Sequence, residues 1–321
     1  MYLSSFALTE PEEMFYPYGP SWLNAWESHL YNRALKSTGA RGWAFKRFGT
    51  ATENYAGEMI RNPQYMKYLD AMEQVADVAL LGLPTRQRVQ ILRSRTAFIY
   101  IDSWGESGLF ENMSSALHTA TIDTLPKNLV KKFSVKELTC KIRGEKQSLL
   151  QAMRVAQDYL SWDAFDFVVI CGGYRAIPLL TFSDEDIPLK RRARRAAKTL
   201  DINLSVERTG CFIFSQQAGG VQVNCGHYVI PDEKEPAQSR LLAEVLEPDL
   251  VSFASLRKDG LLTAGRAAAR NIDLVELYGG SGCLTPALSW EYIKQHSLSQ
   301  GCMRTILPDG MGGYNFFDTQ Y

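Results

Sequence analysis

The chain has 321 residues, of which 45% are hydrophobic and 22% charged, the composition of a folded protein rather than a disordered one. Its 35 basic and 35 acidic residues give a net charge of +0, so we expect no nucleic-acid partner. No apolar run reaches the roughly 18 residues that a membrane span needs, and the N-terminal segment is acidic, unlike a signal peptide. We therefore expect a cytoplasmic protein without a membrane partner, built from two domains or one duplicated unit.

Residues before 138 predict a mostly helical region around one central strand. The predicted elements are a strand over 1–8, a helix over 21–37, a helical stretch over 51–83 interrupted before Pro63, a strand over 97–101 and a short helix from Pro126. The polar segment 103–123 is long for a loop of a compact domain. That length indicates a functional or a mobile segment.

Residues 138–173 predict a strand, a helix and a second strand. The apolar run 138–142 ends at Gly144, and residues 147–162 then repeat apolar side chains at the 3.6-residue period of a helix. Polar side chains occupy only one narrow stripe of this helix, so we expect it to be almost completely enclosed. The continuous apolar run 167–171 indicates a strand that is buried on both faces.

The remaining residues repeat this order of strand, glycine turn and helix. The predicted elements are paired strands over 211–214 and 221–230, helices over 238–246 and 257–270, a strand over 273–278, a helix over 284–295 and final strands over 303–307 and 314–319. The six cysteines form no CxxC pair, and several lie within apolar strands. They are expected to be reduced, structural thiols, and no spacing of Cys or His indicates a metal site.

Together these elements resemble the thiolase superfamily, in particular its β-ketoacyl-carrier-protein synthase III branch. The resemblance rests on the pattern of 138–173, its repetition over 272–295, and the glycine-rich closing segment 304–318. It implies an α/β protein with a thiolase-like five-layered α/β/α/β/α fold, in which two buried helices meet end to end. The duplicated halves are expected to span residues 1–185 and a shortened 186–321, and to meet near 186–205.

The resemblance also implies three catalytic positions, and none of them carries a residue of the family. The acylated cysteine falls on Lys146, or on Gln147 if the register slips by one residue. A histidine position falls on Ala254, and a histidine or asparagine position falls on Gly280. These side chains cannot polarise a thioester carbonyl or stabilise its oxyanion. We therefore expect no catalytic residue at the family positions, with Ser148 and His118 as weaker alternatives.

Lys146 has an unfavourable position if it starts a helix, because its ammonium group faces the positive end of the helix dipole. We expect Glu145, another carboxylate or an acidic ligand to offset this charge. A second group of charges lies in 190–195, where five basic residues follow three acidic ones, as is typical of a solvated helix. The alternative is a patch that faces the phosphates of CoA or phosphopantetheine. Its arginines are Arg191, Arg192, Arg194 and Arg195.

Two functions from different classes remain. The first is a non-catalytic ketosynthase-III-like subunit that pairs with a Cys-bearing condensing enzyme in fatty-acyl, polyketide or related secondary-metabolite biosynthesis. The partner would be such a homologue or a second copy of this chain, with an acyl carrier protein as a further candidate. The alternative is an acyltransferase or thioester hydrolase that uses Ser148, Lys146 or His118. No tightly bound cofactor is expected, and a CoA or phosphopantetheine thioester is the candidate ligand.

Overall fold

The computed structural model describes residues 1–12, 14–20, 25–48, 63–102, 127–185, 202–230, 248–255, 270–309 and 313–321. Ten strands form one large sheet: β1 (Tyr2–Thr9), β4 (Thr96–Asp102), β5 (Leu138–Arg143), β6 (Phe167–Tyr174), β8 (Arg208–Ser215), β9 (Val221–Cys225), β10 (Leu250–Phe253), β11 (Arg270–Asp273), β12 (Cys302–Pro308) and β13 (Tyr314–Gln320). Their spatial order is β11-β10-β12-β13-β9-β1-β8-β6-β4-β5. The strand predictions over 1–8, 97–101, 138–142, 167–171, 303–307 and 314–319 are confirmed.

The large sheet consists of two groups of five strands with the same topology. In the first group β5, β4 and β6 are parallel neighbours, and β8 and β1 follow in antiparallel order. In the second group β11, β10 and β12 are parallel neighbours, and β13 and β9 follow in antiparallel order. A short antiparallel pairing of β1 with β9 joins the groups. The chain thus repeats one arrangement twice, as the sequence predicts.

The change from one group to the next lies between β8 and β9, and the groups join through β1 and β9. The predicted boundary at 185 and 186 adjoins residues 186–201, which lie outside the described residues, and it stays a prediction. The strands over 211–214 and 221–230 were predicted to pair with each other, and this is wrong because β1 lies between them. The chain passes from β8 to β9 through a turn that requires glycine at position 220. The φ of Gly220 is +84°, and a side chain there would meet the Leu3 carbonyl oxygen of β1 at 2.1 Å.

Helices cover one face of the first group and fill the space between the two groups. The helical segments are α1 (Ala25–Thr38), α2 (Pro63–Gly82), α3 (Thr85–Ile91), α5 (Lys127–Lys132), η2 (Glu145–Gln147), α6 (Ser148–Ser161), α7 (Pro178–Glu185), α10 (Leu274–Tyr278), η4 (Gly282–Ala287) and α11 (Leu288–Gln295). The α2 helix packs on β8 and β1, whereas α6 contacts strands of both groups, β6 and β4 on one side and β9 and β13 on the other. The predicted helices over 238–246 and 257–270 lie outside the described residues, except that Arg270 begins β11.

The two central helical segments, η2 with α6 and η4 with α11, meet at their first turns. Trp290 of α11 is only 1% exposed and packs against Phe212 of β8 and Phe317 of β13, with ring centroids 5.4 and 5.5 Å away. One side chain thus joins both strand groups in a single core. The α6 helix is less enclosed than predicted, because Gln151 and Asp158 on its polar stripe reach solvent.

A strand was predicted over 273–278, and this is wrong. The strand β11 ends at Asp273, and α10 begins directly after it. The Asp273 carboxylate accepts a hydrogen bond from the Glu276 backbone N–H at 2.9 Å, which caps the first turn of the helix. The apolar residues after Asp273 fit a strand by composition, but the cap and the end of the pairing with β10 favour a helix.

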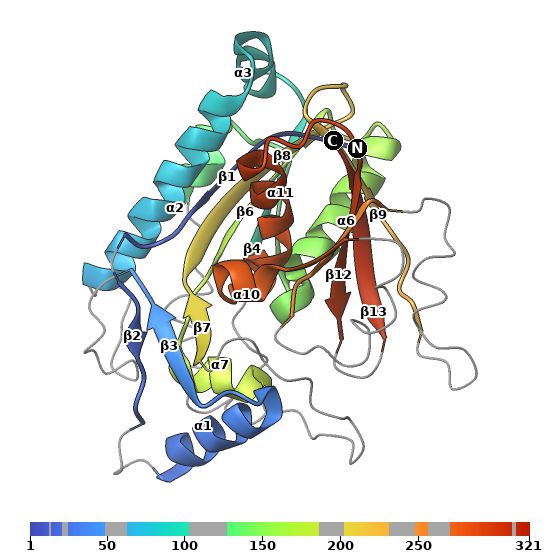
Figure 1. Ribbon diagram of the computed structural model, residues 1–321. Coiled ribbons are helices and arrows are strands. Elements are labelled where there is room, and N and C mark those ends of the chain that lie inside the picture. The colour runs from blue at the N-terminus through green and yellow to red at the C-terminus, as the bar shows by residue number, and fades with distance from the viewer. Residues whose placement is uncertain are drawn as a thin grey trace.

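A smaller sheet, which the sequence does not predict, lies at one end of the molecule (Figure 1). It has the order β2 (Tyr16–Pro17), β3 (Gly42–Lys46) and β7 (Ile202–Val206), and α1 packs against α7 beside it. Phe182 of α7 is fully buried and contacts Trp43 and Phe45 of β3. This aromatic cluster fixes α7 at the end of β6.

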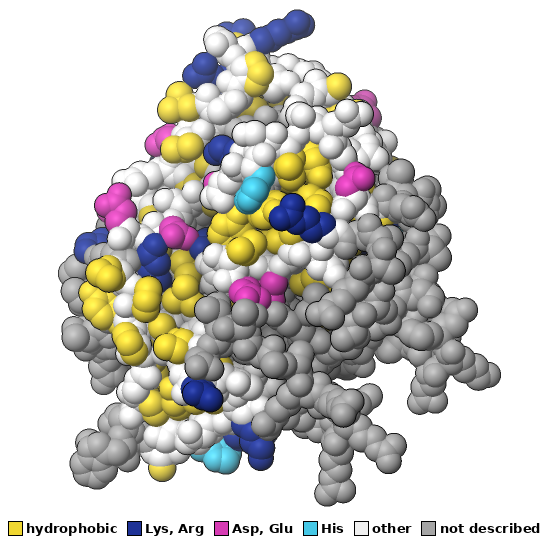
Figure 2. Space-filling model, in the orientation of Figure 1, with side chains coloured by type: hydrophobic (Ala, Val, Ile, Leu, Met, Phe, Trp, Pro, Cys, Tyr) yellow, Lys and Arg dark blue, Asp and Glu magenta, His cyan; other side chains and the backbone are white. Residues whose placement is uncertain are grey.

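The visible surface mixes side chains of different kinds. Figure 2 shows apolar, basic and acidic side chains interspersed over the described part, with basic groups at the tip formed by α3. This distribution agrees with the net charge of +0. None of the described helices combines the length and the apolarity needed to cross a membrane.

Candidate functional site

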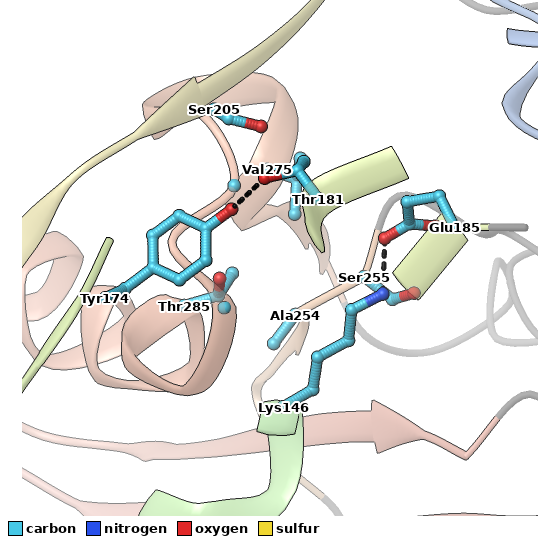
Figure 3. A pocket seen from close by; sticks show the side chains of 11 residues that line it. Lys146, Tyr174, Thr181, Glu185, Ser205, Ala254, Ser255, Val275 and Thr285 are labelled. Carbon is cyan, nitrogen blue, oxygen red and sulfur yellow. Dashed lines mark hydrogen bonds and ion pairs between the residues drawn. The ribbon is translucent and has the colours of Figure 1, made fainter. Parts of the chain in front are cut away.

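A small cavity lies where the first turns of the two central helical segments meet. The lining residues are Lys146, Tyr174, Thr181, Glu185, Ser205, Ala254, Ser255, Val275, Gly280, Gly282 and Thr285 (Figure 3). Both strand groups and the small sheet contribute to its wall. Its volume is about 30 Å³, close to the share of a single water molecule in liquid water. The structure thus brings Lys146, Ala254 and Gly280 together at one point.

Lys146 reaches the cavity from the 3₁₀ turn η2, directly before α6. The Gln147 backbone N–H donates to the Gly144 carbonyl at 2.7 Å, which closes this turn. The side chain of Gln147 accepts a hydrogen bond from Asn315 of β13 at 3.2 Å and is not part of the cavity wall. Of the two registers considered for the nucleophile position, Lys146 is therefore the one that faces the cavity.

An ion pair with Glu185 offsets the charge of Lys146 (Figure 3). Glu185 ends α7, and its side chain is only 5% exposed, whereas that of Lys146 is 29% exposed. The Ser37 hydroxyl donates to the Glu185 backbone carbonyl, which ties the end of α7 to α1. The carboxylate expected near Lys146 is thus supplied from 39 residues away. Sequence reasoning assigned Glu185 to the acids before a basic helix.

Gly280 lies in a turn between α10 and η4 that is held against β7. Its N–H donates to the Leu204 carbonyl at 2.8 Å, and its carbonyl accepts from the Val206 N–H at 2.8 Å. The preceding Gly279 has a φ of +76°, and a side chain there would lie 2.7 Å from a Val206 methyl group. Gly279 is therefore required by the turn, whereas a side chain at Gly280 would make only ordinary contacts, the nearest at 3.7 Å.

Arg208 of β8 holds the same turn through hydrogen bonds. Its guanidinium donates to the Tyr278 carbonyl at 2.6 Å and to the Ser281 hydroxyl, and it forms an ion pair with Glu10 at 2.5 Å. Burial lowers the pKa of Arg208, and the charge of Glu10 opposes that shift. Burial raises the pKa of Glu10, but Arg208 and Lys46 outweigh burial and hold this pKa below its usual value. The network positions the wall of the cavity and does not enter it.

The rest of the wall presents a methyl group and hydroxyl groups. Ala254 follows β10, is 7% exposed, and its N–H donates to the Ile306 carbonyl at 3.0 Å. The hydroxyls of Tyr174 and Thr181 are hydrogen bonded to each other at 3.1 Å (Figure 3). The remaining hydroxyl-bearing residues of the wall are Ser205, Ser255 and Thr285. Among the described residues that line the cavity, none is a cysteine, a histidine or an asparagine.

Of the alternative site residues, the structure describes only Ser148. Ser148 is the first residue of α6, is fully buried and is not part of the cavity wall. His118 and the basic patch Arg191, Arg192, Arg194 and Arg195 lie outside the described residues. Among the described residues, no cluster of three or more His, Cys, Asp or Glu side chains could hold a metal ion.

Comparison with known proteins identifies the fold. No family model and no curated protein sequence matches the chain. Solved structures of OleA from Xanthomonas campestris do match: a variant with bound cerulenin has a TM-score of 0.58 at 10% identity, covering 100% of this chain and 96% of that one. A variant with bound lauric acid and lauroyl-CoA has a TM-score of 0.57 at 10% identity, with 100% and 98% coverage. The chain has a thiolase fold.

OleA is a condensing enzyme of the synthase-III-like branch, so the predicted five-layered fold of two duplicated halves is confirmed. Sequence reasoning located Lys146, Ala254 and Gly280, because each lies in a segment with a recognisable strand or turn. It missed Tyr174, Thr181, Glu185, Ser205, Ser255 and Thr285, which line the same cavity. Thr181, Glu185 and Ser205 lie in α7 and β7, two segments that the sequence does not predict, and no local signal marks Tyr174, Ser255 and Thr285 as cavity residues. This chain therefore has the thiolase fold with a cavity whose wall carries an ion pair and hydroxyl groups.

Proposed function

We propose that this chain is a non-catalytic ketosynthase-III-like subunit that pairs with and supports a Cys-bearing condensing enzyme. The thiolase fold supplies the class of partner, because duplicated halves of this kind belong to condensing enzymes such as OleA. The observation that carries the proposal is the cavity, in which Lys146 is ion-paired to Glu185 and Ala254 and Gly280 offer no functional group. Acyl transfer needs a nucleophile, a proton carrier and oxyanion donors at one point.

The size of the cavity supports the same conclusion. Ligand sites commonly enclose about 300–1,000 Å³, whereas this cavity encloses about 30 Å³. The Lys146 and Glu185 side chains occupy the region between η2 and α7 (Figure 3). A thioester carbonyl would have to displace an ion pair in which one partner is buried, and burial makes such displacement costly. Within the described part of the wall, the ion pair occupies the space that a thioester would need, and this favours a chain that buttresses a partner.

The edge strand β5 offers a surface for pairing. Among the described residues β5 pairs with β4 alone, so one side of its backbone faces outward from the sheet. Its apolar side chains Leu138, Cys140 and Ile142 are half-buried. An unprotected edge strand is a template for pairing with another chain. The partner would be a Cys-bearing homologue or a second copy, and an obligate interface would bury more than about 2,000 Å².

Co-expression with a Cys-bearing synthase III homologue, followed by light scattering and a condensation assay, tests this function. We expect a stable heterodimer whose activity resides in the partner and falls when this chain is left out. Thr139→Lys, at an exposed position of the edge strand β5, should dissociate the complex, whereas Gln222→Lys, at an exposed position of β9 inside the sheet, should not. A stable monomer at micromolar concentration, alone and with every candidate homologue, would contradict the proposal.

An acyltransferase or thioester hydrolase is the second candidate. The presence of Lys146 and the hydroxyl groups of Ser255 and Thr285 in one cavity favours it. Lauroyl-CoA, which an OleA variant binds, is a suitable probe of the thioester class. Release of free CoA by this chain alone, abolished by Lys146→Met, would support this candidate over the non-catalytic subunit.

A further inference from the structure

Two cysteine thiols lie in contact in the core of the first strand group. Cys171 of β6 and Cys211 of β8 are direct partners in the antiparallel pairing of these strands. Their sulfur atoms are 3.0 Å apart, and both residues are fully buried. Directly opposed residues of an antiparallel pair have Cβ atoms about 4.5–5.5 Å apart, and those of a disulfide lie about 3.5–4.5 Å apart. A disulfide would therefore need only a small approach of the two strands.

The position of this pair in the chain gives it a consequence for the cavity. Residues 172–210, between the two cysteines, include α7 and β7. They carry four of the cavity residues, namely Tyr174, Thr181, Glu185 and Ser205. The pairing of β6 with β8 continues for three residue pairs beyond the cysteines, to Tyr174 and Arg208, so a bond between Cys171 and Cys211 would lock the two strands from which this segment emerges. We propose that Cys171 and Cys211, which the sequence suggests as reduced thiols, form a disulfide that stabilises the strands carrying the cavity wall which holds Glu185 against Lys146.

The surroundings of the pair determine how the bond forms. Both thiols belong to the apolar cluster beneath α2, together with Val169 and Ile213. Burial, and then the neighbouring thiol, raises the pKa of Cys171 well above its ordinary value, while Lys132 opposes this shift. The thiolate is the reactive form, so exchange in the closed native state is slow. The bond is accordingly expected to form during folding or during opening of the β6 and β8 strands.

Formation of the disulfide needs an oxidant, and a low-molecular-weight disulfide such as oxidised glutathione can supply it. One cysteine attacks it and forms a mixed disulfide, which releases one molecule of reduced glutathione. The second cysteine then displaces the other glutathione and completes the protein disulfide. Two protein thiols are oxidised, one disulfide is reduced, and the two thiol protons end on the two glutathione molecules.

Refolding of the full chain from urea in a glutathione redox buffer tests the bond. Free thiols are then blocked with N-ethylmaleimide under denaturing conditions, and the disulfide is mapped by mass spectrometry. We expect a peptide that links Cys171 with Cys211, absent from Cys171→Ala and from Cys211→Ala. The matched control Cys302→Ala, a change of a buried cysteine on another strand, should retain it. Complete alkylation of both thiols, or a link to a different cysteine, would overturn the assignment.

Two further measurements test the effect on the cavity wall. The loop that the bond closes is of moderate length, so the oxidised chain should melt higher than the reduced chain by on the order of 5–10 °C. Amide hydrogen exchange over α7 should be slower in the oxidised chain, whereas exchange over α11 should not change. Formation of the bond with unaltered exchange over α7 would overturn the link to the cavity. Neither readout depends on a partner, so both are independent of the proposed pairing.

Discussion

Lys146→Cys would place a thiol at the position predicted for the nucleophile, and we expect it not to restore condensation. At the other two predicted catalytic positions, Ala254 offers only a methyl group and Gly280 has no side chain, and both residues line the same cavity. Each absent donor or acid commonly costs about 10²–10³-fold in rate, so two independent losses amount to about 10⁴–10⁶-fold. The deficit is far larger than any gain from a new nucleophile.

The introduced thiol would also meet an unfavourable charge. Removal of Lys146 takes the charge of this ion pair away from the Glu185 carboxylate, which is 5% exposed. A neighbouring carboxylate disfavours a thiolate and should raise the pKa of the new cysteine above about 8.5. Loss of one partner of a fully buried pair costs about 3–5 kcal/mol; because Lys146 is 29% exposed, we expect about 1–3 kcal/mol for this variant.

The assay is incubation with acyl-CoA and a malonyl thioester, followed by intact mass for acylation and by product analysis for condensation. Lys146→Cys should acylate slowly and give no product. The double variant Lys146→Cys with Glu185→Gln is the matched control, and it should acylate faster because the opposing carboxylate is gone. Adding Gly280→Asn, which the turn has room for, should raise the rate further. Condensation by the single variant at a rate near that of ordinary synthases would refute this reasoning.

Three predictions concern stability. Glu207 is fully buried and accepts from the Arg47 guanidinium at 2.7 Å, so Glu207→Gln should lower the free energy of unfolding by about 3–5 kcal/mol in urea titrations, and an unchanged midpoint would contradict this. Trp290→Ala should cost about 3–5 kcal/mol by the same measurement, because the side chain joins both strand groups. The pKa of Glu10 is lowered in the folded state by Arg208 and Lys46, so its contribution is present above the unfolded pKa of about 4.3 and is lost as pH falls through the folded pKa. Melting temperatures between pH 6 and pH 3 should therefore fall more steeply for the native chain than for Glu10→Gln.

Local patterns in the sequence predict the repeated strands and helices of the central layers. Continuous apolar runs such as 167–171 mark strands buried on both faces, and the period of 147–162 marks a helix, because both signals arise from local burial. The same patterns located Lys146, Ala254 and Gly280, each next to a recognisable strand or glycine turn. They could not give strand order, and the predicted pairing of 211–214 with 221–230 failed because β1 lies between them.

The surroundings of Lys146 depend on contacts between distant segments and cannot be predicted from local patterns. Glu185 and Ser205 come from α7 and β7, whose short segments carry weak local patterns and are held by packing around Phe182. The contact of Cys171 with Cys211 likewise follows from the register of β6 on β8 and from no spacing in the chain. Long-range pairing creates the ion pair, the size of the cavity and the thiol contact, because each depends on where distant segments meet in space.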